Sequence, residues 1–410
     1  MLTGENGVLT KATEAKEKTM EEQVKEGIEL MSTEYTGGKY IGEEKDIKKF
    51  YQQKASKGEI SSIKDNGDET YTIHKDGYEV KIDKEGSVIE IQEKKEVAVT
   101  EIWYKIDGTT LHLSNSDLGG YLKHNESLEE PEWLEGTTNL IPSPITKVIF
   151  DNNVAPISTE KWFKWCGNLT EIENIEYLNT SNVLNMASMF QACNKLQYVD
   201  VSEFDTSNVT NMYAMFYFCN KINNIDVSGF DTSKVTRIGE MFSFCYELRS
   251  IDVSGFNTKN LNDRYAISGM FAYCESLENV DVSNFDTSKV THMNDMFNHC
   301  TNLTNLDLSN FNTSNVTDMG NMFAGCTALT KLDLSNFNTS KVNRMVVMFD
   351  GCTSLNYLNL TNFDTKNISD CRWMFRNVLP TAEIYVGTKW TLEAENVGFT
   401  GKFLVGDNLK

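Results

Sequence analysis

The sequence predicts an α+β protein in which a long helix and an antiparallel four-strand meander precede a repeat solenoid with a parallel sheet. Three observations lead to this expectation. Apolar residues have helical spacing near the start, four short alternating runs lie between residues 59 and 91, and a 26-residue period begins near residue 162. Charged residues are concentrated in the first 96 positions, and all nine cysteines lie at or beyond Cys166, which predicts a boundary between domains 1–96 and 97–410.

The first segment has the pattern of a charged amphipathic helix. Gly37-Gly38 is expected to end it, and a shorter helix over 43–54 is expected to place Ile47, Phe50 and Tyr51 inward. The apolar residues of the first helix recur three to five positions apart: Val8, Ala12, Ala15, Met20, Val24, Ile28 and Met31.

Four strand-like runs follow, with the sequences EISSIK, ETYTIH, YEVKI and SVIEI. They are separated by Asn66-Gly67, Asp76-Gly77 and Glu85-Gly86, which are hairpin turn signals. We therefore expect an antiparallel meander that packs on the long helix.

This plan resembles type IV pilin-like subunits, and the opening LTGENGVLTKATEAKEKT resembles the segment after the membrane helix of bacterial prepilin-type proteins. The apolar, spanning half of that helix and its processing motif are absent. The resemblance implies membrane attachment only through a missing N-terminal hydrophobic segment, and self-assembly of the pilin kind. A charged helix on a small sheet, with no role in export, is the alternative.

The rest of the chain is built on a repeat. The step between copies is 26 residues except for one step of 29, where NTKNLNDRYAISGMF carries three extra residues that we expect to form a surface loop. Trp162-Phe163 with Cys166 is interpreted as a degenerate first copy. The Met-Phe pairs that mark the copies begin at Met189, Met215, Met241, Met270, Met296, Met322, Met348 and Met374.

One unit, residues 303–328, shows why the copies stack. Leu306 and Leu308 alternate with polar residues as in a short half-buried strand, and Phe311, Met322 and Cys326 return at turn or helical spacing. One unit cannot bury these groups alone, so stacking predicts a solenoid over 146–378 with caps at 97–145 and 379–410. Its strands are expected to pair in parallel through Val199, Ile225, Ile251, Val280, Leu306, Leu332 and Leu358.

The unit resembles the 26-residue leucine-rich repeats of BspA-like bacterial surface proteins, LxxLDLSxFDTSxVTxMxxMFxxC, from about residue 169 to 378. That family consists of exported or surface-attached proteins, several linked to adhesion to host or matrix components. The resemblance implies an extracellular binding scaffold and supplies no catalytic residues.

The nine cysteines are expected to be free. Their number is odd, no CxxC occurs, and equivalent positions in successive coils give no cysteine a preferred partner. Buried thiols suit a tightly packed inner column, with disulfides and a metal as the alternatives. Cys371 is out of register with the others and is interpreted as a core substitution.

Composition and motifs argue against several functions. The net charge of −21 disfavours nucleic acid as a partner. No GxSxG, HExxH or phosphate-binding loop occurs, so we expect no enzyme, no cofactor and no metal. His292, His299 and Cys300 form the nearest approach to a zinc site, but His292 is expected on the solvent side and Cys300 inward.

Candidate ligand contacts lie in two outward rows of the strand segments. One row repeats an aspartate, and its mutual repulsion could be offset by hydroxyl and N–H groups, by calcium, or by a polar partner. The neighbouring row varies, as expected of either ligand contact or drift. The candidates are Asp226, Asp252, Asp281, Asp307 and Asp333 in the first row, and Tyr198, Asn224, Asn279, Asn305, Lys331 and Tyr357 in the second.

Together these features predict a surface adhesion protein that presents a leucine-rich repeat solenoid on a pilin-like stem to a protein or glycan ligand. The alternative is a structural subunit or spacer without a ligand. A binding protein should carry a contiguous aromatic or charged patch, whereas a spacer should be uniformly polar.

Overall fold

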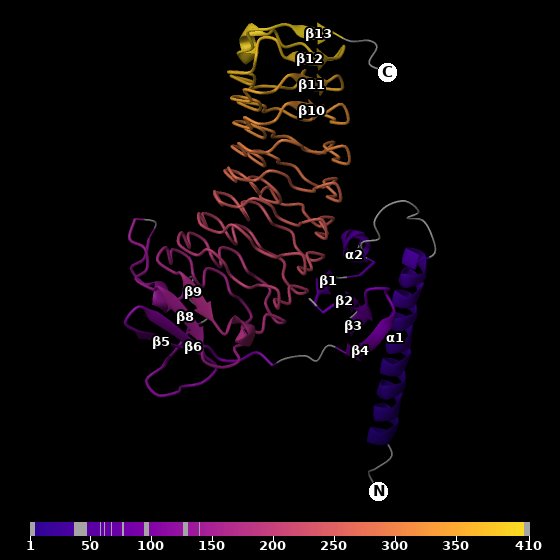
Figure 1. Cartoon of the computed structure of the whole chain (residues 1–410), viewed down its shortest axis with the longest axis vertical. Helices are drawn as coiled ribbons and strands as arrows, with labels where there is room; N and C mark the ends of the chain where they lie inside the picture. The colour runs from indigo at the N-terminus through magenta and orange to yellow at the C-terminus, as the bar shows by residue number, and fades with distance from the viewer. Residues whose placement is uncertain are drawn as a thin grey trace.

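The computed structural model describes residues 5–36, 47–57, 59–60, 62–66, 68–75, 78–93, 98–125, 130–138 and 140–405. An N-terminal unit of two helices and one sheet lies beside a tall column of stacked coils (Figure 1). The pair Gly37-Gly38 and the turn residues Gly67 and Asp76-Gly77 lie outside the described residues.

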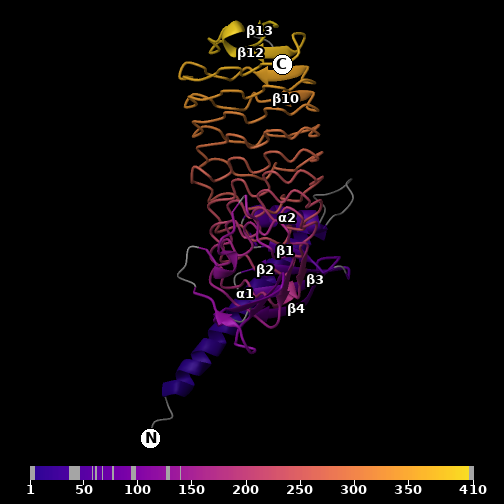
Figure 2. The same cartoon turned by 90° about the vertical axis from the view of Figure 1, so that its left-hand side faces the viewer.

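The N-terminal unit contains the long helix and the meander that the sequence predicts. Helix α1 spans Glu5–Thr36 and α2 spans Ile47–Ser56, and the first four residues of the predicted second helix, 43–46, lie outside the described residues. The first half of α1 extends away from the rest of the structure (Figure 2). The sheet runs antiparallel in the order β1-β2-β3-β4, with β1 at Ser62–Asp65, β2 at Thr70–Lys75, β3 at Tyr78–Asp83 and β4 at Val88–Glu93.

This unit has its own hydrophobic core. Val24 and Ile28 of α1 and Tyr51 of α2 pack with Ile73 and Val80 of the sheet, and all five are buried. Period-2 alternation in β3 places its even-numbered apolar residues in this core, which is the physical basis of the predicted meander. Met20 is exposed instead of lying on the buried stripe, and the side chains of Val8, Ala12 and Ala15 lie outside the described residues.

A five-stranded sheet with the order β7-β5-β6-β8-β9 leads into the column. The predicted cap segment 97–145 contains an antiparallel hairpin, in which β5 (Trp103–Asp107) pairs with β6 (Thr110–Ser114). Strand β6 then pairs in parallel with β8 (Lys147–Phe150), and β8 with β9 (Glu171–Glu173), so the parallel stacking direction is already established here. Strand β7 (Leu122–Lys123) forms one edge, and 3₁₀ turns lie at Glu132–Leu134 and Ile175–Tyr177.

Successive coils are hydrogen-bonded through the Met-Phe segments. The N–H of Phe190 donates to the carbonyl of Met215 at 2.9 Å, and the same bond recurs from Phe216 to Met241 at 2.9 Å and from Phe323 to Met348 at 3.0 Å. The phenylalanine rings of this column stack nearly parallel, with centroids 5.3–6.0 Å apart from Phe190 to Phe375. We call this side of the column the Met–Phe face.

Two left-handed residues per coil shape the Met–Phe face. One precedes the methionine, as Asp295 does (φ 61°), and the other precedes the cysteine, as His299 does (φ 57°). Each closes a tight turn, since the N–H of Asn298 donates to the carbonyl of Asp295 at 3.0 Å. The chain therefore returns through tight turns, one of the two geometries expected. Lys161 and Trp165 adopt the same conformation, which supports the interpretation of residues 162–166 as a degenerate copy.

The predicted pairing of the strand segments is correct only near the C-terminal end. A parallel sheet is formed by β10 (Lys331–Asp333), β11 (Tyr357–Leu360), β12 (Glu383–Val386) and β13 (Phe403–Val405), in which Leu332 pairs with Leu358. The prediction is wrong for the earlier copies, which have no assigned strand at Val199, Ile225, Ile251, Val280 and Leu306.

The two sides of the column also differ in the spacing of their phenylalanine rings. Phe337 and Phe363 on the strand side, where the strands do pair, have centroids 6.4 Å apart. The rings of Phe323 and Phe349 on the Met–Phe face are closer, at 5.6 Å between centroids. We call the side formed by residues 305–309 and their equivalents the strand face. Its apolar residues are buried, apart from the half-buried Leu306.

The cysteines form an inner column of free thiols. Eight are buried, and Cys371 is half-buried. Each thiol from Cys193 to Cys352 donates to the carbonyl of a phenylalanine in the preceding coil, as Cys326 does to Phe297 at 3.1 Å. Burial raises the pKa of the Cys245 and Cys326 thiols to about 12, which suppresses the reactive thiolate.

A thiol reagent is therefore expected to label one cysteine of the folded protein. Cys371 is the accessible one, and Cys371→Ala should remove the label, while unfolding should expose all nine thiols of the wild type. Reducing agent should leave the unfolding transition unchanged. Mass spectrometry of the labelled protein checks the site, and a loss of stability on reduction would show that disulfides exist.

Aromatic residues close the C-terminal end of the column. Phe375, the last ring of the Met–Phe stack, packs against Phe399 at 5.8 Å, Phe403 at 5.7 Å and Trp390 at 6.3 Å between centroids. A 3₁₀ turn at Glu395–Val397 lies in the same segment. These residues keep the end of the stack out of water. In the described part of the chain, no helix is long and apolar enough to cross a membrane.

Candidate binding groove

The eleven residues proposed from the sequence lie on the strand face. Tyr198 is 59% exposed, and Asn224, Asn279, Asn305 and Lys331 are also exposed. Tyr357 is half-buried and its ring packs on that of Tyr385, with centroids 5.5 Å apart. The structure thus places these six residues in one row but does not gather them into a pocket.

The aspartate row caps the turn that ends each strand segment. The Oδ1 atom of Asp281 accepts the N–H of Ser283 at 3.0 Å and its hydroxyl at 2.6 Å, and Asp252 does the same with Ser254. The hydroxyl and N–H groups that could offset repulsion along the row therefore do so. Equivalent bonds to backbone N–H are accepted by Asp200, Asp226, Asp307 and Asp333.

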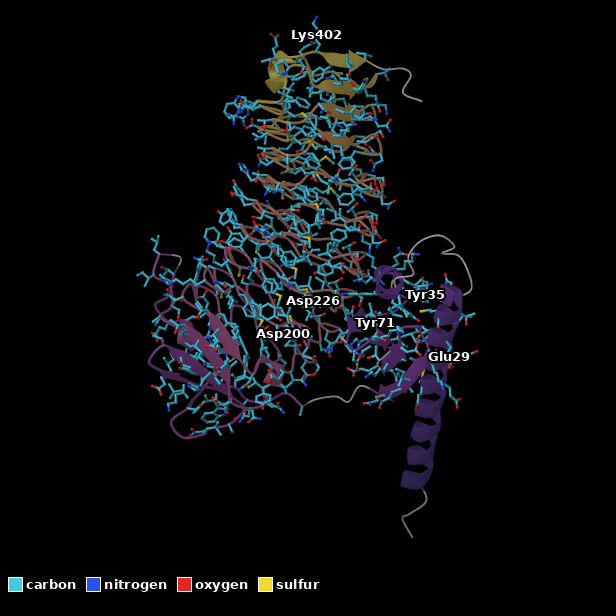
Figure 3. The ribbon with its side chains drawn as sticks, in the orientation of Figure 1. Glu29, Tyr35, Tyr71, Asp200, Asp226 and Lys402 are labelled. Carbon is cyan, nitrogen blue, oxygen red and sulfur yellow. The ribbon has the colours of Figure 1, made fainter. Side chains whose placement is uncertain are left out.

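Part of this row faces the protein's own N-terminal unit. Gln52 of α2 donates to the Oδ2 of Asp252 at 2.7 Å, and Lys64 of β1 pairs with Glu203 beside the row. Figure 3 shows Asp200 and Asp226 on the side of the column next to this unit. Asp252 thus contacts, in this structure, a polar partner supplied by the same chain.

Hydrogen bonds make one carboxyl of the row, that of Asp307, sensitive to acid. The N–H and hydroxyl of Ser309 hold the pKa of Asp307 below its usual value. A carboxyl with a lowered pKa in the folded state contributes stability above its unfolded pKa of about 3.9 and loses that contribution as the pH falls towards the folded pKa.

We therefore expect Asp307→Asn to reduce the loss of stability in acid. The variant keeps the Oδ1 acceptor but has no proton to gain, so its stability should differ from wild type less at pH 2 than at pH 5. Urea unfolding at both pH values measures this. An identical change with pH in the two proteins would show that Asp307 does not contribute.

A groove with a volume of about 560 Å³ lies on the Met–Phe face, and none of the eleven candidates lines it. Its lining extends over seven consecutive coils, from Tyr217 to Asn377. Arg264 and Tyr265, which belong to the three-residue insertion of the 29-residue step, form part of its wall and are exposed. The insertion is therefore a surface loop, as expected, and it also builds the site.

Aromatic residues follow the groove in a contiguous strip. The rings of Phe244, Tyr273 and His299 are stacked at 4.4 and 4.5 Å between centroids, each one coil from the next. After His299 the column continues as Gly325 and Gly351, which leave an open floor without side chains. Together with their ring neighbours, the three stacked rings form a set that we call the aromatic strip: Tyr217, Phe218, Phe244, Tyr246, Tyr273 and His299.

Carboxylates line the same groove. Asp350 is paired with Arg376, whose Nε lies 3.0 Å from Oδ1. Asp295 accepts hydrogen bonds from Asn294 at 2.8 Å and Asn298 at 3.1 Å. Burial, and next the charge of Asp295, raises the pKa of Glu240, although the hydroxyl of Tyr213 donates to that carboxylate.

Several polar groups in the groove have no intramolecular partner within the described residues. Ser243 is only 2% exposed and lines the groove, yet its hydroxyl takes part in no side-chain hydrogen bond with another described residue. The phenols of Tyr217 and Tyr265 and the side-chain amide of Asn321 also line the groove and form no side-chain hydrogen bond with another described residue. Polar groups next to aromatic rings in a concave site are the usual arrangement of a ligand pocket.

Sequence reasoning missed this groove because it examined only the strand face. The available signals were the 29-residue step and the aromatic residues directly before the cysteines in three consecutive copies, Phe218, Phe244 and Tyr273. His299, considered as a zinc ligand, instead stacks on Tyr273. Within the described residues, no group of three His, Cys, Asp or Glu side chains is placed to hold a metal ion.

Comparison with known proteins gives one family. A family model described as "Mycoplasma protein of unknown function, DUF285" matches twice in succession, over residues 157–267 and 265–386. No curated protein matches the chain. The two adjoining matches cover the stacked coils and more than half of the 410 residues. The column with its groove is thus the part of the chain that the family describes, and the protein belongs to the DUF285 family.

Proposed function

We propose that this is a non-enzymatic adhesion protein of the bacterial cell surface, in which a leucine-rich repeat solenoid binds a ligand in the Met–Phe groove. The observation that carries the proposal is the aromatic strip beside the groove. A binding protein needs such a contiguous patch, whereas a spacer would be uniformly polar. The likeness of the repeat to BspA-like surface proteins supports the extracellular location.

Two further features support the proposal. Eight of the nine thiols are buried, and burial raises the pKa of thiols such as that of Cys245, so the column can keep reduced cysteines without a reducing compartment. The N-terminal unit combines a long helix with an antiparallel meander, as a pilin-like stem would, and the first half of α1 extends away from the column (Figure 2).

The projecting helix also favours the second candidate, a structural subunit that assembles through its N-terminal unit and has no ligand. The two functions differ in what the groove does. In the subunit, changing the groove would leave every measurable association unchanged, because assembly would depend on α1 alone.

Binding of the purified chain to immobilised matrix proteins and glycans tests the proposal. We expect saturable binding to at least one of them, lost in Tyr265→Ala at the groove and retained in Tyr198→Ala on the strand face. Both residues are exposed tyrosines, at 42% and 59%, so truncation should not affect folding. Concentration-dependent self-association without saturable binding to any immobilised component would favour the structural subunit.

A further inference from the structure

The groove is lined by both hydrogen-bond donors and hydrogen-bond acceptors. The hydroxyl of Ser243 and the phenol of Tyr217 can each donate and accept, the amide of Asn321 does both, and the carboxylates of Glu240 and Asp295 only accept. A ligand that satisfies all of them must itself carry many groups that both donate and accept. Hydroxyl groups have that property, whereas an ammonium or guanidinium group only donates.

The shape of the groove fits a linear chain. It crosses seven coils, and the rings that neighbouring coils place beside it have centroids 4.4 Å apart between Phe244 and Tyr273 and 4.5 Å apart between Tyr273 and His299. Each coil thus offers one set of polar positions per step, at a spacing similar to the length of one sugar ring. Gly325 and Gly351 keep the floor free of side chains, so a chain can lie along several coils.

Charge in the groove disfavours an acidic ligand. Glu240 and Asp295 form no ion pair with another described residue, whereas Asp350 is already paired with Arg376. Arg264 supplies the guanidinium at the rim, where it packs over the ring of Tyr265 at 5.1 Å. Two carboxylates against one guanidinium leave the site with a net negative charge, so carboxylated or sulfated chains would be repelled.

We propose that the groove binds a neutral, linear glycan chain, with Tyr265 providing an aromatic surface at the wall and Glu240, Ser243 and Asp295 bonding its hydroxyl groups. This assignment rests on the proposed binding function and specifies its ligand. Tyrosine offers a rigid apolar face with a polar end, which suits a ring that is apolar on one face and hydroxylated at its edge. Carboxylates form the stronger hydrogen bonds to such hydroxyls.

Titration calorimetry of the full chain with neutral β-linked glucose and N-acetylglucosamine oligomers tests this. Affinity should rise with oligomer length, because a longer chain contacts more coils. Tyr265→Ala and Ser243→Ala should each weaken binding by about tenfold, as expected when one contact to a buried polar group or ring is lost. Tyr198→Ala, the matched control on the strand face, should bind as wild type does.

Two other probes distinguish a wrong ligand class from the absence of a binding function. An oligomer of uronic acid should bind more weakly than the neutral chain, and a lysine oligomer should not compete with it. If only the lysine oligomer binds, and Tyr265→Ala abolishes this, the ligand class is wrong but the binding function stands. If no neutral oligomer binds, or if binding is equal in Tyr265→Ala, the glycan assignment is overturned.

Discussion

Phe297→Ala is expected to lower the free energy of unfolding by about 3–5 kcal/mol, the usual cost of removing a fully buried phenylalanine. The ring of Phe297 lies between those of Phe271 and Phe323, at 5.8 and 6.0 Å between centroids, and is completely buried. Truncation would leave a cavity in the middle of the stack, where the hydrogen bonds between coils on both sides limit relaxation.

The matched control is Phe218→Ala on the aromatic strip. Phe218 is half-buried and has water on one side, so its loss should cost less than that of Phe297. Urea unfolding followed by circular dichroism measures both. Equal effects of the two variants would mean that the Met-Phe ring column is no more central to stability than the surface strip.

Gly239→Ala should destabilise the protein by about 1–3 kcal/mol and also impair the groove, because the added methyl overlaps backbone. A Cβ at this position would lie 2.3 Å from the carbonyl oxygen of Tyr265 and 3.0 Å from that of Ser268. The N–H of Gly239 donates to the same Tyr265 carbonyl at 3.0 Å, so this contact holds the insertion in place. Displacing it moves Arg264 and Tyr265 away from the groove wall.

Gly229→Ala is the control for this change. A Cβ at Gly229 would meet only the carbonyl oxygen of Ser202, at 4.0 Å, so the substitution should be neutral or stabilise slightly through the unfolded chain. Melting temperatures of the two variants and their binding in the groove are the measurements. Wild-type stability and binding in Gly239→Ala would show that the insertion does not depend on this close approach.

The sequence predicts the elements of this protein better than their pairing. The 26-residue period places Phe297 and Cys300 in the core because apolar groups at fixed positions can be buried only by stacking. The helix stripe is correct at Val24 and Ile28 for the same reason. The hydrogen bonds between coils lie on the face where residues such as Glu240 and Phe244 adopt the left-handed conformation. Non-glycine residues rarely adopt it, so their identity gives no signal for it in the sequence.

The candidate site shows the same limit. The sequence leaves three alternatives open for the Asp281 row, and one of them, solvation by hydroxyl and N–H groups, is present in the structure, because Asp281 and Ser283 are close enough along the chain to bond locally. The contact of Gln52 with Asp252 joins residues 200 positions apart, and no pattern in one sequence indicates it. The lining of the groove combines the insertion with residues from seven consecutive coils, so the groove exists only in the stacked arrangement.

Residue-resolved hydrogen exchange tests most directly the claim that the Met–Phe face holds the coils together and shapes the groove. The amides of Phe190, Phe216 and Phe323 donate to the neighbouring coil, so they should exchange slowest, near the limit set by global unfolding. The amides of Val199 and Ile225 on the strand face, which pair with no strand, should exchange faster. Slow exchange at Val199 and Ile225 together with fast exchange at the phenylalanines would contradict this account.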